Sequence, residues 1–174
     1  MKSCTHVYYG TGKGKTTAAV GLAVRAAGAG CPVLFCQFLK SGETAELSVL
    51  KALPEVQIFR PEGSYPFTRQ MTDDDHRAIT AEHNRILEQI SAILSHVRDQ
   101  DFVVILDELA WAFHYDLIDR DRVLSLLDSK KAEFVITGRV CVPELIARAD
   151  YVTNLQEEKH PYQKGISARK GIEF

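Results

Sequence analysis

The feature of this sequence that most limits its fold is a glycine-rich stretch, 10–17, that directly follows a short apolar segment, 4–9. The core of this stretch is Gly14, Lys15 and Thr16, the signature of a phosphate-binding loop. In such a loop, backbone N–H groups surround a phosphate, the lysine neutralises it and the hydroxyl ligates Mg²⁺. The loop leads from a buried strand to the N-terminus of a helix. The sequence therefore predicts an α/β fold that binds a nucleotide and magnesium.

The loop is one residue shorter than the usual pattern. That pattern has a glycine five positions before Gly14, whereas this chain has Tyr9 there and its nearest glycine is Gly10. The short approach suggests that the nucleotide is not used in the ordinary way. The loop residues that we expect to contact it are Gly10, Thr11, Gly12, Lys13, Gly14, Lys15, Thr16 and Thr17.

Apolar segments of strand length alternate with helical segments along the rest of the chain. The expected strands are 4–9, 32–38, 56–59, 102–106, 133–137 and 151–155. The expected helices are 15–29, 44–53, a long one after Thr72, segments up to Leu127, and 143–147. Such alternation with short connections is typical of a parallel sheet covered on both faces. We predict one domain, 1–174, of the P-loop NTPase (RecA-like) type, with a mostly parallel sheet of about six strands.

The long helix carries one apolar stripe and a polar face. Its apolar residues recur in steps of three and four, as in a helix that packs on a sheet. They are Ile79, Ile86, Leu87, Ile90, Ile93, Leu94 and Val97. His76 and His83 lie seven residues apart, and we expect them on the solvated polar face rather than at a metal site.

The composition excludes several classes of protein. The chain has 174 residues, 45% hydrophobic and 25% charged, with a net charge of −2, which are ordinary values for a soluble domain. Nothing favours binding to nucleic acid or an anionic membrane, and no apolar run approaches the ~20 residues of a membrane span. The N-terminus lacks an apolar signal segment, and the four cysteines form no C-x-x-C pair. We therefore expect a cytoplasmic protein with buried, reduced thiols.

Charged residues follow two of the expected strands, where a parallel sheet binds its ligands. Asp107 and Glu108 end the segment 102–106 and are expected to hold Mg²⁺, the alternative being helix-capping acids. Arg139 follows 133–137 and either grips a phosphate or is solvated. Arg25, in the first helix, contacts a ribose or caps a carboxylate.

Known classes of P-loop protein match these residues unequally. An Asn-Lys-x-Asp motif is absent, which argues against a GTPase, and the missing C-x-x-C argues against a thymidine-kinase-like chain. The residues alone thus indicate a protein that binds ATP and magnesium beside an aromatic-bearing loop, 60–71, with no obvious phosphate acceptor.

Five segments together resemble the ATP:corrinoid adenosyltransferases of the cobalamin pathway, in order and nearly end to end. They are Gly10 to Ala19, Gln37-Phe38-Leu39-Lys40, Leu106-Asp107-Glu108-Leu109, Thr137-Gly138-Arg139, and the ending from His160-Pro161-Tyr162 to Gly171-Ile172-Glu173-Phe174. The short loop in combination with this ending is specific to the family.

The resemblance implies adenosyl transfer, in which a reduced Co(I) corrinoid, the co-substrate, attacks the 5′-carbon of MgATP and triphosphate leaves. This chemistry needs positioning and leaving-group stabilisation but no general base, because Co(I) carries no proton. Lys15 and Glu108 would be the catalytic residues, with Mg²⁺ held by Thr16, Glu108 and Asp107 and with help from Arg139. The resemblance also implies a homodimer and a reductase that supplies Co(I).

Two aromatic residues precede the long helix in members of this family and help to displace the lower base of the corrinoid. Phe67 matches the first of them. Arg69 stands at the second, and Tyr65 is the nearest other aromatic residue. Some members also have a long N-terminal segment that covers the partner's site, whereas this chain begins almost at its first strand.

Two other functions stay open on the sequence. A small-molecule phosphotransferase would produce ADP rather than triphosphate. A nucleotide-dependent regulatory module would bind ATP without corrinoid-dependent turnover. The segment 160–174 favours the adenosyltransferase, because a generic nucleotide switch has no reason to carry it.

Overall fold

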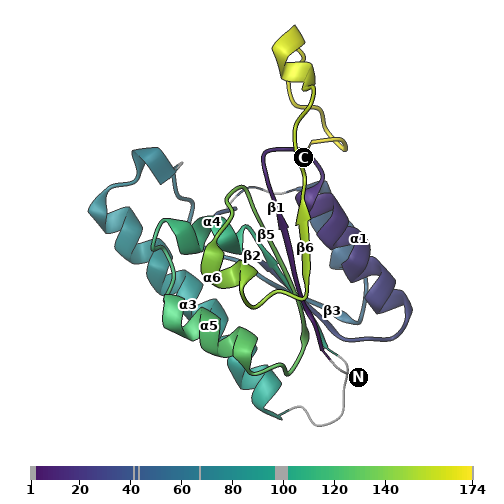
Figure 1. The fold of residues 1–174 in the computed structure, drawn as a ribbon, viewed down its shortest axis with the longest axis vertical. Coiled ribbons are helices and arrows are strands. Elements are labelled where there is room, and N and C mark those ends of the chain that lie inside the picture. Colours follow the sequence, from purple (N-terminus) through teal and green to yellow (C-terminus); the bar gives the residue numbers. More distant parts are fainter. Residues whose placement is uncertain (1–2, 41, 43, 67, 97–101, 174) are drawn as a thin grey trace.

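The computed structural model describes residues 3–40, 42, 44–66, 68–96 and 102–173. Six strands form one sheet in the order β3-β2-β4-β5-β1-β6, and every pairing between them is parallel (Figure 1). The strands are β1 (Thr5–Tyr9), β2 (Val33–Gln37), β3 (Val56–Phe59), β4 (Val103–Asp107), β5 (Glu133–Gly138) and β6 (Tyr151–Asn154). The predicted α/β class with a parallel sheet is confirmed.

Helices cover both faces of the sheet. They are α1 (Lys15–Gly28), α2 (Ala45–Leu50), α3 (Asp73–His96), α4 (Leu109–His114), α5 (Arg120–Asp128) and α6 (Pro143–Ile146). One buried cluster joins α1 and α2 to Val33 and Phe35 of β2. A second cluster joins α3, α4 and α5 to Leu34 and Cys36 of the same strand. Successive residues of a strand face opposite sides, so the continuous apolar runs of the sequence supply both cores.

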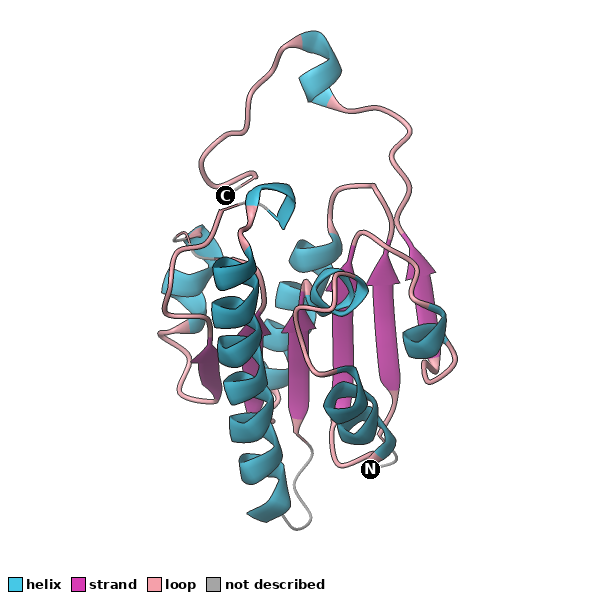
Figure 2. Ribbon diagram, turned by 90° about the vertical axis from the view of Figure 1, so that its left-hand side faces the viewer, coloured by secondary structure: helices cyan, strands magenta, loops and turns pink. Residues whose placement is uncertain are grey.

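The register of the strands brings their carboxyl ends to one edge (Figure 2). Gln37 at the end of β2 pairs with Asp107 at the end of β4, and Tyr9 at the end of β1 pairs with Gly138 at the end of β5. Since β5 lies between β4 and β1, the loops that follow all three strands are neighbours. Ligands of open parallel sheets bind at this edge.

The tail beyond β6 leaves the body of the molecule at the same edge (Figure 1). Residues 161–173 are exposed along their whole length and contain one short 3-10 helix, Pro161–Lys164. None of the helices in the described ranges is long and apolar enough to cross a membrane.

Two local expectations need correction. His83 is not solvated: its side chain is fully buried under α3, where Nδ1 donates to the Leu117 carbonyl at 2.7 Å and Nε2 accepts from the Leu39 N–H at 3.4 Å. A helix face can carry a buried histidine when both ring nitrogens find partners. The cysteines also differ in burial, since Cys36 is buried whereas Cys141 is exposed. Val97, expected in the apolar stripe, lies outside the described residues.

Candidate active site

The glycine-rich loop between β1 and α1 approaches the backbone that follows β6 very closely. Gly10 has φ of 114°, and a Cβ there would lie 2.3 Å from the Leu155 carbonyl oxygen. The Gly12 N–H donates to the same oxygen at 2.8 Å. Gly14 also has positive φ, 112°, and no side chain of the described residues caps the first N–H groups of α1. These N–H groups and the positive end of the helix form an anion-binding site.

Lys15 lies inside this loop. Its side chain is only 8% exposed, and its ammonium donates to the Gly12 carbonyl at 2.7 Å. Burial lowers the pKa of the ammonium, since the charged form is the one that loses hydration. A phosphate held in the loop would offer the ammonium a stronger, charged acceptor than the carbonyl does.

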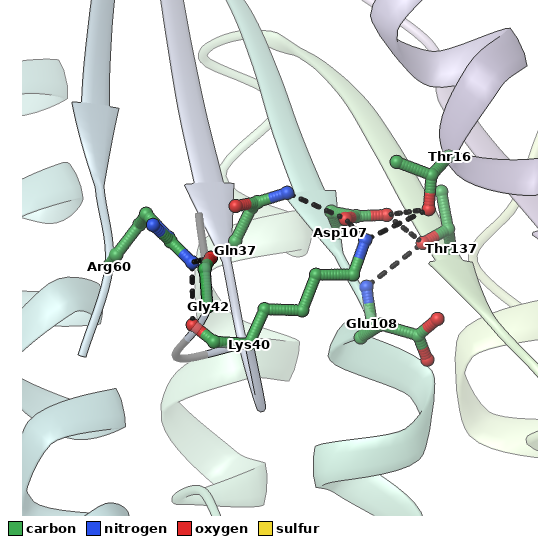
Figure 3. A network of polar contacts seen from close by, with 8 residues as sticks. All are labelled: Thr16, Gln37, Lys40, Gly42, Arg60, Asp107, Glu108 and Thr137. Atoms are coloured by element: carbon green, nitrogen blue, oxygen red, sulfur yellow. Dashed lines mark hydrogen bonds and ion pairs between the residues drawn. The ribbon is translucent and has the colours of Figure 1, made fainter. Parts of the chain in front are cut away.

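Asp107 is the centre of a polar network under the loop (Figure 3). Its carboxylate is completely buried, and four neighbouring side chains donate to it. Oδ1 accepts from the hydroxyls of Thr16, at 2.8 Å, and Thr137, at 2.7 Å. Oδ2 accepts from the Lys40 ammonium at 2.6 Å and the Gln37 amide at 3.3 Å. The carboxylate therefore ties together the ends of β2, β4 and β5 and the first turn of α1.

Glu108 occupies the sharp turn from β4 into α4. Its φ is 62°, in the left-handed region that a residue with a side chain rarely adopts, and its N–H donates to the Thr137 hydroxyl at 2.9 Å. Burial raises the pKa of its carboxyl, and the negative charge of Asp107 adds to this effect. Unfavourable backbone conformations of this kind are often found at functional sites.

Two cavities meet at this edge of the sheet, and Glu108 and Arg139 line both. The first has a volume of about 480 Å³ and lies over the loop; its other walls are Thr11 to Thr17, Glu157, His160, Tyr162, Gln163, Ile172 and Glu173. The second, of about 970 Å³, is lined by Leu39, Lys40, Pro61, Gly63, Tyr65, Pro66, Thr68, Gln70, Met71, Ile79 and Trp111. One cavity is thus suited to phosphates and the other to a larger, partly apolar molecule.

The end of the tail returns to the glycine-rich loop. Lys13 and Glu173 form an ion pair of 2.7 Å, and Arg169 contacts the same carboxylate at 3.1 Å. Hydrogen bonds from Arg169 and Lys13 lower the pKa of Glu173 to about 2. The carboxylate is therefore a permanent negative charge at the mouth of the first cavity.

Most residues that the sequence singled out come together here. Those that line the first cavity are Thr11, Gly12, Lys13, Gly14, Lys15, Thr16, Thr17, Glu108 and Arg139. Gly10 and Asp107 are buried just beneath them. Arg25 is not part of this cluster: it is exposed in the last turn of α1, about 15 Å along the helix from Lys15. Phe67 lies outside the described residues.

Sequence reasoning missed two residues of this region. Lys40 entered only as part of a family resemblance, although it follows the strand next to that of Asp107 and so had to lie at the same edge. Trp111 lies outside the sequence segments that carry the family resemblance. It half-buries its ring against the second cavity and donates its indole N–H to the Thr68 hydroxyl at 3.2 Å. Nothing in the sequence indicated which side of α4 would face that cavity.

Known proteins resemble this chain over its whole length. The family model of the ATP:corrinoid adenosyltransferases BtuR/CobO/CobP matches residues 1–174. A corrinoid adenosyltransferase from Pseudomonas aeruginosa is 35% identical over 173 residues, which cover 97% of this chain and 82% of the relative. The corrinoid adenosyltransferase CobA of Salmonella typhimurium is 32% identical, with 97% and 84% covered.

Among solved structures, the EssC ATPase domains 2 and 3 of Geobacillus thermodenitrificans have a TM-score of 0.53 to this chain at 14% identity. The match covers 98% of this chain but only 35% of that one, and it supports the P-loop ATPase fold alone. The activity follows instead from the full-length family match and the curated relatives. This chain belongs to the ATP:corrinoid adenosyltransferase family.

Proposed function

We propose that this enzyme transfers the 5′-deoxyadenosyl group of ATP to the Co(I) of a reduced corrinoid and releases triphosphate. The observation that carries this proposal is the pair of cavities that share Glu108 and Arg139 as walls. A triphosphate in the first cavity would leave the sugar of ATP at the boundary with the second. A corrinoid in the second cavity would then face the 5′-carbon rather than the terminal phosphate.

The reaction would form one bond and break one bond at that carbon. The electron pair of Co(I) forms the cobalt–carbon bond, and the electrons of the C5′–O bond leave with triphosphate. No proton moves, so the enzyme needs to align the two substrates and stabilise the departing charge. Lys15 and Arg139 are the cations that would do so, and the loop residues from Gly10 to Thr17 would hold the phosphates. Arg25 lies too far along α1 to join them without a change of conformation.

Magnesium fits the oxygen donors of this site. The Thr16 hydroxyl lies 2.8 Å from Asp107 Oδ1, and Thr16 and Glu108 both line the first cavity. Hydroxyl and carboxylate oxygens are hard ligands of the kind that Mg²⁺ prefers. Mg²⁺ held by Thr16, Asp107 and Glu108 would neutralise charge on the triphosphate. Asp107 is already fixed by its hydrogen bonds, so its position would not depend on the ion.

The second cavity is proposed to bind the corrinoid. Tyr65, Pro66 and Met71 from the segment before α3, and Trp111 from α4, give it apolar and aromatic walls. A volume of about 970 Å³ is in the range of cofactor sites. We propose that Phe67, next to Pro66 in sequence, takes part in binding the corrinoid.

The oligomeric state, the partner and the compartment are also proposals. Exposed apolar side chains on the tail, Tyr162 at 75% and Ile172 at 56%, together with the outer strand β6, support a homodimer. Because each turnover consumes one Co(I), a reductase that supplies electrons to the corrinoid is the expected partner. The four cysteines are free, which is consistent with the reducing cytoplasm.

One assay tests the activity. The protein is incubated with MgATP and chemically reduced cob(I)alamin, and the products are followed by the absorption spectrum of the adenosylated corrinoid and by chromatography of the nucleotide products. We expect adenosylcorrinoid and triphosphate in equal amounts, and neither product when ATP or the reductant is omitted. Formation of ADP would indicate a phosphotransferase instead. A protein that binds ATP without any turnover, with cobalamin or an earlier corrinoid, would refute the proposal.

A further inference from the structure

Lys40 contacts two of the groups that are proposed above as magnesium ligands. Its ammonium lies 2.6 Å from Asp107 Oδ2 and 3.2 Å from the Thr16 hydroxyl oxygen. Figure 3 shows its side chain reaching from the end of β2 across to both groups. A cation thus already stands against the donors of the metal site.

The ammonium balances a charge that the protein cannot leave unpaired. Asp107 is completely buried, whereas the Lys40 side chain keeps 25% of its surface exposed. The other donors to the carboxylate, Thr16, Thr137 and Gln37, are neutral. An isolated carboxylate is very unfavourable in such surroundings, and a cation at hydrogen-bond distance offsets much of that cost.

The backbone of Lys40 is held while its side chain has space to move. The Arg60 guanidinium donates to the carbonyl oxygens of Lys40, at 3.0 Å, and Gly42, at 2.5 Å. Just before it, Leu39 is fixed in the left-handed region at φ of 59°. The side chain lines the second cavity, which offers about 970 Å³ beside it. A movement of the ammonium away from Asp107 therefore requires no change in the fold.

We propose that Lys40 is the counter-ion of the Asp107 carboxylate as long as no metal is bound, and that its ammonium moves away from Asp107 when metal and nucleotide bind. The inference rests on the proposed function, because it takes Asp107 and Thr16 as metal ligands. Displacement would move the ammonium towards the second cavity, next to Glu108. The Glu108 carboxylate already interacts electrostatically with the Lys40 ammonium. Lys40 is thus a positioning residue. Through its displacement, binding of metal and nucleotide in the first cavity would bring a positive charge to the wall of the second cavity.

The test replaces the charge and keeps the length of the chain, as in Lys40→Met. Binding of Mn²⁺, a paramagnetic substitute for Mg²⁺, is measured by electron paramagnetic resonance on the nucleotide-free protein and again with inorganic triphosphate. Without triphosphate, Lys40→Met should bind Mn²⁺ at least about tenfold more tightly than the wild type, because the competing cation is gone. A purely structural loss would weaken metal binding instead. Lys40→Arg, which keeps the charge, and Lys51→Met, at an exposed lysine that follows α2, should both behave as the wild type.

Thermal unfolding gives a second readout that does not depend on activity. The metal-free Lys40→Met protein should melt several degrees below the wild type, and Mg²⁺ should restore more of the melting temperature in the variant than in the wild type. Equal Mn²⁺ affinity in Lys40→Met and the wild type would overturn the inference and leave the metal site intact. If the wild type fails to bind Mn²⁺ even with triphosphate, the magnesium assignment is wrong, and the inference falls with it.

Discussion

At the scale of single residues, the proposed nucleotide site depends most on Lys15. Its ammonium is buried inside the loop, where a backbone carbonyl is its only hydrogen-bond acceptor among the described residues, so it is held in place for a charged ligand. Lys15→Ala should lower kcat/KM by about 10² to 10³, the usual effect of removing one strong group that stabilises a developing charge. Steady-state kinetics measure this, with Lys51→Ala as a control at an exposed position. Full activity in Lys15→Ala would refute the role given to it.

His83 makes stability depend on pH. Burial lowers its pKa in the folded protein to about 4, against an ordinary value near 6.5 in the unfolded chain. Between these two pKa values the unfolded state therefore binds more protons than the folded state. The stability that neutral, buried His83 contributes is complete above about pH 6.5 and is lost as the pH falls towards 4. Acidification from pH 7 to 5 should cost about 2 kcal/mol through this group.

Chemical denaturation at several pH values tests this effect of His83. His83→Gln keeps a hydrogen-bond donor and acceptor but does not titrate, so its free energy of unfolding should fall less between pH 7 and 5 than that of the wild type. His96→Gln, at an exposed position of the same helix, should leave the wild-type slope unchanged. An identical slope in His83→Gln would contradict a neutral, buried His83.

At the scale of elements, Glu82 of α3 holds the segment that lines the second cavity. Its carboxylate accepts from the Tyr65 hydroxyl at 2.5 Å, from the Gly63 N–H at 3.2 Å and from the Glu62 N–H. The bond to Glu82 raises the pKa of Tyr65 to about 12, so the tyrosine stays a donor at any working pH.

Loss of this charge should loosen one cavity and spare the other. Glu82→Gln is expected to raise KM for the corrinoid about tenfold while KM for ATP changes little, since hydrogen bonds to a charged acceptor are worth about 1.5–3 kcal/mol. Glu88→Gln is the matched control, because Glu88 lies on the same helix but pairs with Arg122 at the surface. Equal changes in both KM values would show that Glu82 supports the fold in general.

The glycine-rich loop gives a contrasting pair of stability effects. Gly10→Ala combines positive φ with a Cβ 2.3 Å from the Leu155 oxygen, and it should lower the free energy of unfolding by more than about 2 kcal/mol. Gly21→Ala, inside α1 with open space around it, should raise it by about 1 kcal/mol. Denaturant titration of both variants checks the prediction, and a harmless Gly10→Ala would mean that the loop can move away from β6.

The elements were readable from the sequence to different degrees. Buried parallel strands appear as unbroken apolar runs, so β3 was predicted at its observed bounds and β4 within one residue. The phosphate loop and Asp107 were predictable because their chemistry is local in sequence. His83, Trp111 and Lys40 were misplaced or missed because their roles depend on which side of an element meets a distant one. A pattern of single residues carries no such long-range information.

At the scale of the whole molecule, the sheet order explains why two substrates can meet. β5 lies between β1 and β4, so the glycine-rich loop, Glu108 and Arg139 converge at one point of the sheet edge. The tail closes one side of the first cavity, and the segment before α3 closes the second. The short loop is thus part of a cavity that shares two wall residues with a second one, as the proposed orientation of ATP requires.

The most direct test of this account follows the oxygen that joins the 5′-carbon of ATP to its α-phosphorus. The enzyme is supplied with ATP labelled with ¹⁸O at this position, magnesium and reduced corrinoid, and the products are analysed by mass spectrometry. Attack on carbon breaks the C5′–O bond, so we predict that the label leaves with triphosphate and that the adenosylcorrinoid carries none. Label that stays with the adenosine product, or that appears in ADP, would contradict the account.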